Sequence, residues 1–163
     1  MFVAQDVETG VRFSVARLRL VELIGGRALA EASRAAYGAG LDSLPGRPAA
    51  AHPVPARLMR IRCLEPVPGV EQMTVGLRWE AAGTPGGLFP VLDADLTLVA
   101  IGPQASRLSL AGVYRLPASD ELDPASAGQV ADTTVRVLLG AVAAYLSAAS
   151  FPAASLPRAA GSP

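Results

Sequence analysis

The sequence predicts an α+β fold in which a curved antiparallel sheet wraps around one long C-terminal helix. Two patterns predict it. From Asp123 to Ser150, apolar residues recur at three- and four-residue spacing, as in an amphipathic helix, and between Arg57 and Leu116 four segments alternate apolar and polar residues, as in strands with one buried face. A helix of that length needs a broad apolar surface to lie on, and the sheet supplies one.

Length and composition limit the classes of protein that fit. The chain has 163 residues, 14 basic and 14 acidic side chains, one Cys and one His. We expect a single domain over residues 1–150 and a flexible tail over 151–163, which is rich in Ala, Ser and Pro. The balanced charge argues against a nucleic-acid partner. The single Cys and His argue against a disulfide and most metal sites, so we predict no metal and no cofactor.

The sequence also bears on location. The N-terminal residues hold no basic region followed by an apolar stretch, so we predict no signal peptide. The longest uncharged run, 137–157, is apolar only to about Phe151, which is short of the roughly 20 residues that span a bilayer. We therefore expect a cytoplasmic protein without a membrane span.

The N-terminal part is expected to hold one strand and a short helical pair. Residues 1–7 fit an edge strand that ends at Thr9-Gly10. Residues 11–24 fit a helix about as well as a strand, and Gly25-Gly26 ends the segment. Its apolar row is Val11, Val15, Leu18 and either Val21 or Leu20. Residues 28–41 fit a second helix, with an apolar face of Leu29, Ala32, Ala36, Tyr37 and Leu41.

The middle of the chain predicts an antiparallel meander. Residues 45–55 hold four prolines and no apolar period, so they fit a surface loop. Short connections, including turns at 66–69 and 83–87, join the strands that follow. The four expected strands are 57–65, 72–81, 88–101 and 106–116.

The C-terminal helix has marked ends. Asp123 suits the N-cap, Pro124 suits the first helical position, and Pro152 lies just beyond the last periodic residue. The apolar stripe consists of Val130, Thr134, Val137, Leu138, Ala141, Val142, Tyr145 and Leu146.

Several blocks resemble a known superfamily. Residues 78–83 (RWEAAG), 87–96 (GLFPVLDADL) and 110–115 (LAGVYR) resemble small actinobacterial proteins of the START-like superfamily, also called polyketide cyclase, SRPBCC or Bet v 1-like. Residues 131–136 (ADTTVR) resemble the start of their last helix. The resemblance covers roughly the C-terminal half. It implies a helix-grip fold that holds an apolar ligand, lipid or polyketide-like, between sheet and helix.

The inward faces of the strands and the helix are the predicted lining of this ligand pocket. The residues are Val75, Leu77, Trp79, Leu96, Leu110, Gly112, Tyr114, Leu138, Val142 and Tyr145. Tyr114, Tyr145 or Arg27 are candidates to orient a polar group of a small hydrophobic or amphipathic ligand. Gly112 either lets the helix approach closely or leaves a hollow.

Two other functions stay open at this point. One is a polyketide cyclase-like enzyme that uses the same cavity, although the sequence identifies no catalytic residue. The other is an interaction protein with a closed core, which acts through the sheet face or the Ala-rich helix surfaces.

The remaining polar candidates have structural interpretations. Asp93 and Asp95 lie on one strand face, where a carboxylate pair can act as an acid. We favour instead cross-strand ion pairs with Arg78, Arg107 and Arg115. His52 fits an exposed loop, and Cys63 fits a small buried hydrophobe.

Overall fold

The computed structural model describes residues 1–44, 59–81, 91–115 and 123–148. The expected loop at 45–55 with His52, the turn at 83–87 and the tail at 151–163 lie outside the described residues. The division into one domain and a tail therefore stays a prediction.

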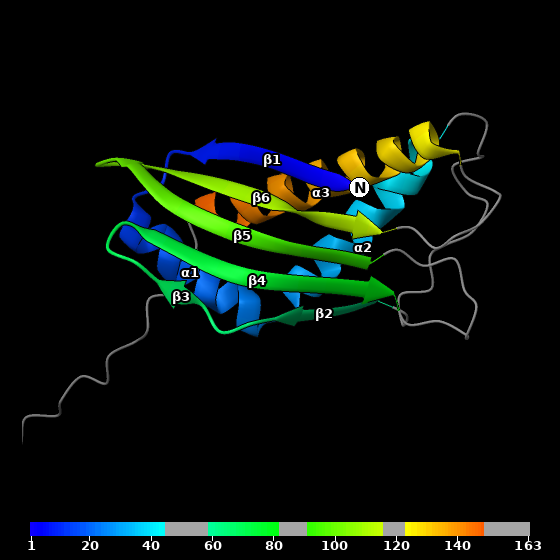
Figure 1. The fold of residues 1–163 in the computed structure, drawn as a ribbon. Coiled ribbons are helices and arrows are strands. Elements are labelled where there is room, and N and C mark those ends of the chain that lie inside the picture. Colours follow the sequence, from blue (N-terminus) through cyan, green and yellow to red (C-terminus); the bar gives the residue numbers. More distant parts are fainter. Residues whose placement is uncertain (45–58, 82–90, 116–122, 149–163) are drawn as a thin grey trace, which may run out of the picture.

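In the described part of the chain, six strands form one antiparallel sheet, and three helices cover one of its faces (Figure 1). The strands are β1 (Phe2–Thr9), β2 (Met59–Cys63), β3 (Val67–Pro68), β4 (Gln72–Ala81), β5 (Val91–Gly102) and β6 (Ala105–Arg115). The helices are α1 (Phe13–Gly25), α2 (Ala28–Asp42) and α3 (Pro124–Ser147). The predicted α+β, helix-grip arrangement is confirmed, with α3 packed against the sheet.

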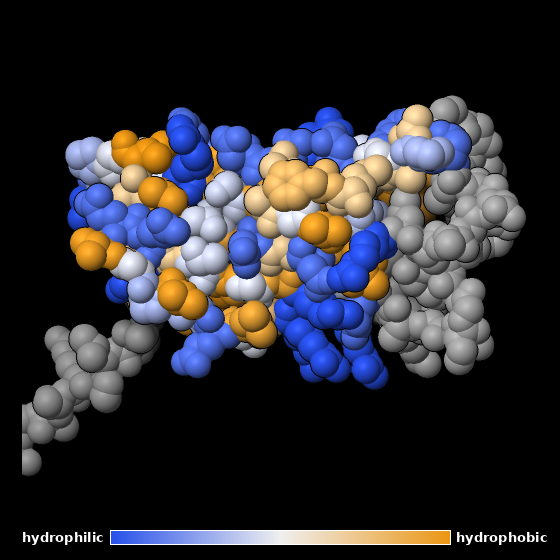
Figure 2. Space-filling view, viewed as in Figure 1, coloured by the Kyte–Doolittle hydropathy of each residue, from blue (hydrophilic) through white to orange (hydrophobic). Residues whose placement is uncertain are grey.

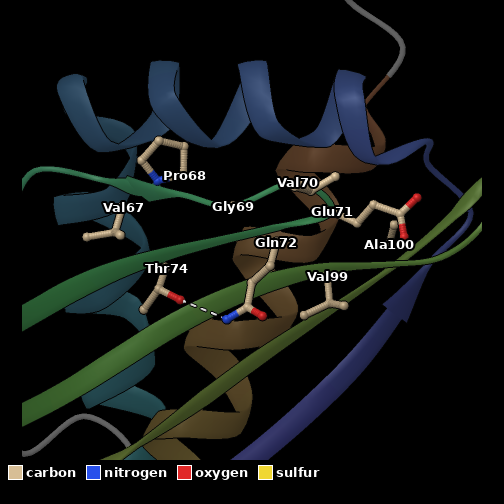
Figure 3. Close-up of a pocket in the computed structure, with 9 residues that line it drawn as sticks. All are labelled: Val67, Pro68, Gly69, Val70, Glu71, Gln72, Thr74, Val99 and Ala100. Carbon is tan, nitrogen blue, oxygen red and sulfur yellow. Dashed lines mark hydrogen bonds between the residues drawn. The ribbon is translucent and has the colours of Figure 1, made fainter.

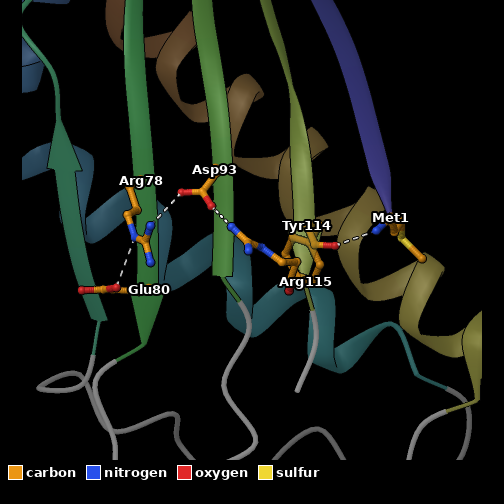
Figure 4. Close-up of polar contacts among 6 residues, drawn as sticks. All are labelled: Met1, Arg78, Glu80, Asp93, Tyr114 and Arg115. Carbon is orange, nitrogen blue, oxygen red and sulfur yellow. Dashed lines mark hydrogen bonds and ion pairs between the residues drawn. The ribbon is translucent and has the colours of Figure 1, made fainter. Parts of the chain in front are cut away.

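The sheet follows the predicted meander, in the order β1-β6-β5-β4-β2, with β3 paired to β4. The N-terminal strand β1 pairs with the last strand, β6, so that Phe2 lies opposite Val113 and Thr9 opposite Ser106. Beyond Phe2 the pairing continues: the Met1 ammonium donates to the Tyr114 carbonyl at 3.0 Å (Figure 4). The predicted N-terminal edge strand is confirmed.

The ambiguous segment at 11–24 is a helix, α1. Its buried residues are Ala16, Leu20 and Leu23, at the spacing of one helical face. Of the predicted apolar row, Leu20, the alternative to Val21, is buried, and Val11 packs against the core. Leu18 and Val21 are instead 59% and 49% exposed, so for these two residues the prediction was wrong. The small Ala16 shares the buried face with Leu20 and Leu23.

One short strand was not predicted. Val67 and Pro68 lie within the expected turn at 66–69, yet they pair with Thr74 and Met73 of β4. Proline is tolerated there because a short edge strand does not need every backbone N–H. The Gly69 N–H then donates to the Gln72 carbonyl at 2.6 Å and closes the hairpin.

Helix α3 begins as predicted. The Asp123 carboxylate accepts from the backbone N–H groups of Ala125 at 2.9 Å and Ser126 at 3.0 Å, and Pro124 opens the helix. The buried residues are Ala127, Val130, Ala131, Thr134, Val135, Leu138, Leu139, Val142, Ala143 and Leu146. By length and composition alone, α3 is also long and apolar enough to cross a membrane. Half of its apolar stretch is buried inside the fold, as in a core helix.

Replacing Asp123 with Ala is expected to destabilise the protein, because two N–H groups of the first helical turn lose their acceptor. The hydroxyl and the backbone N–H of Ser126 hold the pKa of the Asp123 carboxyl below its usual value. This stabilisation is therefore present above the unfolded-state pKa and is lost as pH falls through the folded-state pKa.

Thermal unfolding between about pH 7 and about pH 3 checks this. The Tm of Asp123→Ala should lie a few degrees below wild type near neutrality, and the gap should narrow in acid. Asp123→Asn keeps an acceptor and is the matched control, with a Tm close to wild type near neutrality. A gap that stays constant across the range would contradict the assignment.

Candidate functional site

The residues predicted to line a pocket lie in one interior between the sheet and α3. Eight of the ten are no more than 4% exposed: Val75, Leu77, Trp79, Leu96, Leu110, Tyr114, Leu138 and Val142. Tyr145 is partly buried against the same core. Arg27, one candidate for orienting a ligand, is exposed at the start of α2 and does not belong to this interior.

Three aromatic side chains meet where α2 packs on the sheet. We call Tyr37 of α2, Trp79 of β4 and Tyr114 of β6 the aromatic cluster. The ring centroids of Tyr37 and Trp79 are 5.3 Å apart, at an edge-to-face angle of 73°. Those of Trp79 and Tyr114 are 6.1 Å apart. The strands β4 and β6 flank β5, so their backbones are roughly 10 Å apart. Their rings therefore lean toward each other across Leu92, the residue that pairs with both.

Helix α3 adds a hydroxyl, that of Thr134, through a close contact with α2. A Cβ on Gly40 of α2 would overlap Thr134 Oγ1 and lie 2.8 Å from the Val130 carbonyl oxygen. Glycine at this position therefore lets the two helices approach with Thr134 between them. The Thr134 hydroxyl faces Tyr114 closely enough to influence its pKa.

Three buried polar atoms at this place have no hydrogen-bond partner: Trp79 Nε1, Tyr114 Oη and Thr134 Oγ1. Each of the three residues is 1% exposed. Although the Tyr114 and Thr134 hydroxyls are near neighbours, they do not form a hydrogen bond with acceptable geometry. A buried polar group left unpaired costs about 1–3 kcal/mol, so native proteins keep few of them. Three on neighbouring residues mark a place where a polar partner would offset this cost.

The electrostatics of the site keep Tyr114 neutral. Burial raises the pKa of its phenol far above the ordinary 10.0, the neighbouring Tyr37 adds to the rise, and the Thr134 hydroxyl opposes it. The Tyr114 hydroxyl therefore keeps its proton around neutral pH and remains able to donate a hydrogen bond.

We expect Tyr114 to ionise only when the protein unfolds in alkali. Because its pKa is raised in the folded state, it contributes stability that is complete below the unfolded-state value of about 10 and is lost as pH rises through the folded value. Phenolate absorbance and circular dichroism, followed together in an alkaline titration, should show one phenol ionising with unfolding. Tyr114→Phe should lack that component. Complete ionisation of the tyrosines in folded protein would contradict the burial argument.

The sequence identified part of this site. Trp79 and Tyr114 belong to the predicted lining, whereas Tyr37 and Thr134 were assigned only to the apolar faces of their helices. One signal was present: Thr134 is a polar residue inside an otherwise apolar stripe, and a buried hydroxyl needs a partner.

The three atoms nearest to an added Cβ on Gly112 all belong to β5. Such a Cβ would overlap the Asp93 carbonyl oxygen and lie 2.5 Å from the Cα and Cβ of Ala94. The missing side chain therefore lets two adjacent strands, β5 and β6, approach each other closely.

Gly112→Ala is therefore expected to lower the free energy of unfolding by about 1–3 kcal/mol, because the backbone of β5 must move. Gly140→Ala is the matched control. Gly140 is exposed on α3 with nothing within 4 Å of an added Cβ, and the change should raise that free energy by about 0.5–1 kcal/mol. Urea unfolding of both variants measures the difference. Similar effects of the two substitutions would contradict the close approach at Gly112.

The outer face of the sheet carries ion pairs. Asp93 pairs with Arg78 at 3.5 Å and with Arg115 on its other side, and Arg78 also contacts Glu80 at 3.4 Å (Figure 4). This confirms the predicted cross-strand pairs for Asp93, which is engaged by cations from both neighbouring strands. Arg107 was assigned to the same set but pairs with Glu8 of β1 at 2.8 Å.

A shallow hollow of about 420 Å³ also lies on this outer face. Its floor is low because Gly76 and Ala111 carry little or no side chain, and Leu64 leans over Gly76. Asp95 lines the hollow and takes part in no ion pair among the described residues. Figure 2 shows the face as a mixture of hydrophilic and hydrophobic residues.

A second hollow, of about 400 Å³, lies beside β3 (Figure 3). It is lined by Val67, Pro68, Gly69, Val70, Glu71, Gln72, Thr74, Val99 and Ala100. Its polar side chains are exposed or partly exposed, and Gln72 already donates weakly to Thr74 at 3.4 Å. The lining of neither hollow includes Trp79, Tyr114 or Thr134, which carry the buried polar atoms without a hydrogen-bond partner.

Other reactive groups add no site within residues 1–44, 59–81, 91–115 and 123–148. No three His, Cys, Asp or Glu side chains in these segments are grouped to hold a metal ion. Cys63 is only partly buried, on the inner face of β2, and burial raises the pKa of its thiol.

The chain was compared with protein families, curated proteins and solved structures. No protein-family model and no curated protein matches the chain. Among solved structures, the Zhui aromatase/cyclase from Streptomyces sp. R1128 aligns at 12% identity over 90% of this chain and 93% of that one, with a TM-score of 0.40. The human StarD13 (DLC2) lipid transfer and protein localization domain aligns at 12% identity over 89% of this chain and 76% of that one, with a TM-score of 0.43.

At 12% identity and TM-scores below 0.5, neither match says anything about the activity of this chain. By its own sheet order and long C-terminal helix, the chain has the helix-grip fold that the sequence predicted.

Proposed function

We propose that the protein binds a small hydrophobic or amphipathic molecule between the sheet and α3, with the polar end of the ligand beside the aromatic cluster. The observation that supports this is a set of three buried polar atoms without a hydrogen-bond partner on neighbouring residues: Trp79, Tyr114 and Thr134. A bound polar group would offset their desolvation.

The rest of the predicted lining supplies apolar walls. Val75 and Leu77 on β4, Leu110 on β6, and Leu138 and Val142 on α3 carry no polar side-chain atom and are at most 4% exposed. Burial of an apolar ligand surface against such walls contributes roughly 25 cal/mol per Å². Because these side chains are nearly fully buried, a ligand must displace some of them as it binds. Amide hydrogen exchange in α2 and α3 would report that displacement.

Two alternatives compete with this proposal. A polyketide cyclase-like enzyme needs an acid or base in the interior, but the buried polar residues among those described, apart from the aromatic cluster, are Thr9, Ser33, Ser106 and Thr134, none of them ionisable near neutral pH. An interaction protein with a closed core agrees with the near-complete burial of the lining side chains. The experiment below separates it from ligand binding.

Native mass spectrometry of the purified protein, compared with its mass under denaturing conditions, tests the proposal. A discrete extra mass that is lost on denaturation is the expected result. Thr134→Val keeps the side-chain shape but removes the hydroxyl, so the fraction of protein carrying that mass should fall. Ser109→Ala, on the outer sheet face, is the control and should retain the wild-type fraction. A bare protein that also binds no apolar fluorescent probe would establish the closed core.

A further inference from the structure

The unpaired atoms beside the aromatic cluster limit the chemistry of the ligand's polar end. Trp79 Nε1 is a donor only, whereas the hydroxyls of Tyr114 and Thr134 both donate and accept. The group therefore offers up to three donors from three different elements, β4, β6 and α3. None of the three side chains carries a charge near neutral pH.

One charged side chain reaches the margin of this interior. Arg34 lies on α2, one turn before Tyr37, and its Nε is buried without a hydrogen-bond partner. Helical geometry places Arg34 about 60° around the axis from Tyr37, on the side opposite Gly40 and its contact with Thr134. Arg34 as a whole is partly exposed. It therefore flanks the cluster, while the three neutral groups form the cluster's polar centre.

The acidic side chains on β5 and α3 point away from the aromatic cluster. Asp93 and Asp95 project from the outer face of β5, on the opposite side of the sheet. Asp132 of α3 is exposed and engaged with Arg136 and with Gln5 of β1. A carboxylate that binds beside Trp79, Tyr114 and Thr134 would lose its hydration and would gain no cation among its direct partners. Desolvating an unpaired charge in a dry interior costs much free energy.

We infer that the ligand ends in an uncharged oxygen, a ketone or a hydroxyl, which forms its hydrogen bonds within the group made by Trp79 Nε1 and the hydroxyls of Tyr114 and Thr134. This inference rests on the proposed function and adds the chemical class of the ligand's polar end. A ketone oxygen accepts two hydrogen bonds through its lone pairs, and a hydroxyl both accepts from Trp79 and donates to Tyr114 or Thr134. Aliphatic carbon atoms beyond that oxygen then lie along the apolar walls.

The chain contains its own reporter for the test, because Trp79 is its single tryptophan. Three probes of equal length, 2-octanone, 1-octanol and octanoate, are titrated against the wild-type protein near neutral pH. Trp79 fluorescence and isothermal titration calorimetry follow binding. We expect the ketone and the alcohol to bind at least about tenfold more tightly than octanoate.

Variants then locate the polar end. Tyr114→Phe and Thr134→Val each remove one hydroxyl and should weaken 2-octanone about fivefold. Both should leave the affinity for N-phenyl-1-naphthylamine, a neutral apolar probe, unchanged, which also shows that the variants are folded. Ser109→Ala on the outer face should change neither affinity. Arg34→Gln should leave 2-octanone binding unchanged.

The outcomes separate the inference from the proposed function. If octanoate binds as tightly as the ketone or more tightly, and loses affinity in Arg34→Gln, the uncharged end is wrong and an interior ligand site remains. If 2-octanone binds but neither hydroxyl substitution weakens it, the assigned contacts are wrong. If neither the three octyl probes nor N-phenyl-1-naphthylamine binds, the inference and the proposed function both fail.

Discussion

The fold depends on burying a wide apolar surface of α3 against two partners, the sheet and α2. Its buried residues include adjacent pairs, such as Val130 with Ala131 and Leu138 with Leu139, so the apolar surface is wider than a single stripe. The sheet covers one part of this surface and α2 covers another, so α3 is covered on two sides (Figure 1). A third side, with Asp132, Arg136 and Gly140, stays exposed. The crossing of α2 on α3 at Gly40 then decides which polar residue meets the sheet. That residue is Thr134.

Local patterns were sufficient for most of the sheet and for the start of α3. A period of two assigns each β4 side chain to a face, so Val75, Leu77 and Trp79 were predicted inward and are buried. Turn-forming residues separate the strands, and capping chemistry at Asp123 marks the first turn of α3. Local patterns were insufficient where two faces of a helix fit the apolar spacing about equally well. In α1, Ala16, Leu20 and Leu23 are buried and Leu18 is exposed, although Leu18 is the larger apolar residue at the predicted position.

The meeting of Tyr37, Trp79, Tyr114 and Thr134 was beyond local patterns for a different reason. These residues come from α2, β4, β6 and α3, and their distances depend on how two helices cross over a curved sheet. Periodicity reports which side of an element is buried, but it does not report what lies opposite. The same limit applies to Gly112, whose missing side chain accommodates the neighbouring strand β5, an approach that its own position in β6 does not indicate.

The cluster is costly for a protein that only needs to fold. Valine in place of Thr134 and phenylalanine in place of Tyr114 would conserve most of the buried volume and remove two unpaired hydroxyls. The cost of keeping them is of the order of 1–3 kcal/mol each, against a typical total stability of about 5–15 kcal/mol for a domain. That cost is the physical reason for proposing a ligand here. In the proposed function, the bound ligand would satisfy the hydrogen-bonding capacity of these atoms, and the recovered free energy would add to its affinity.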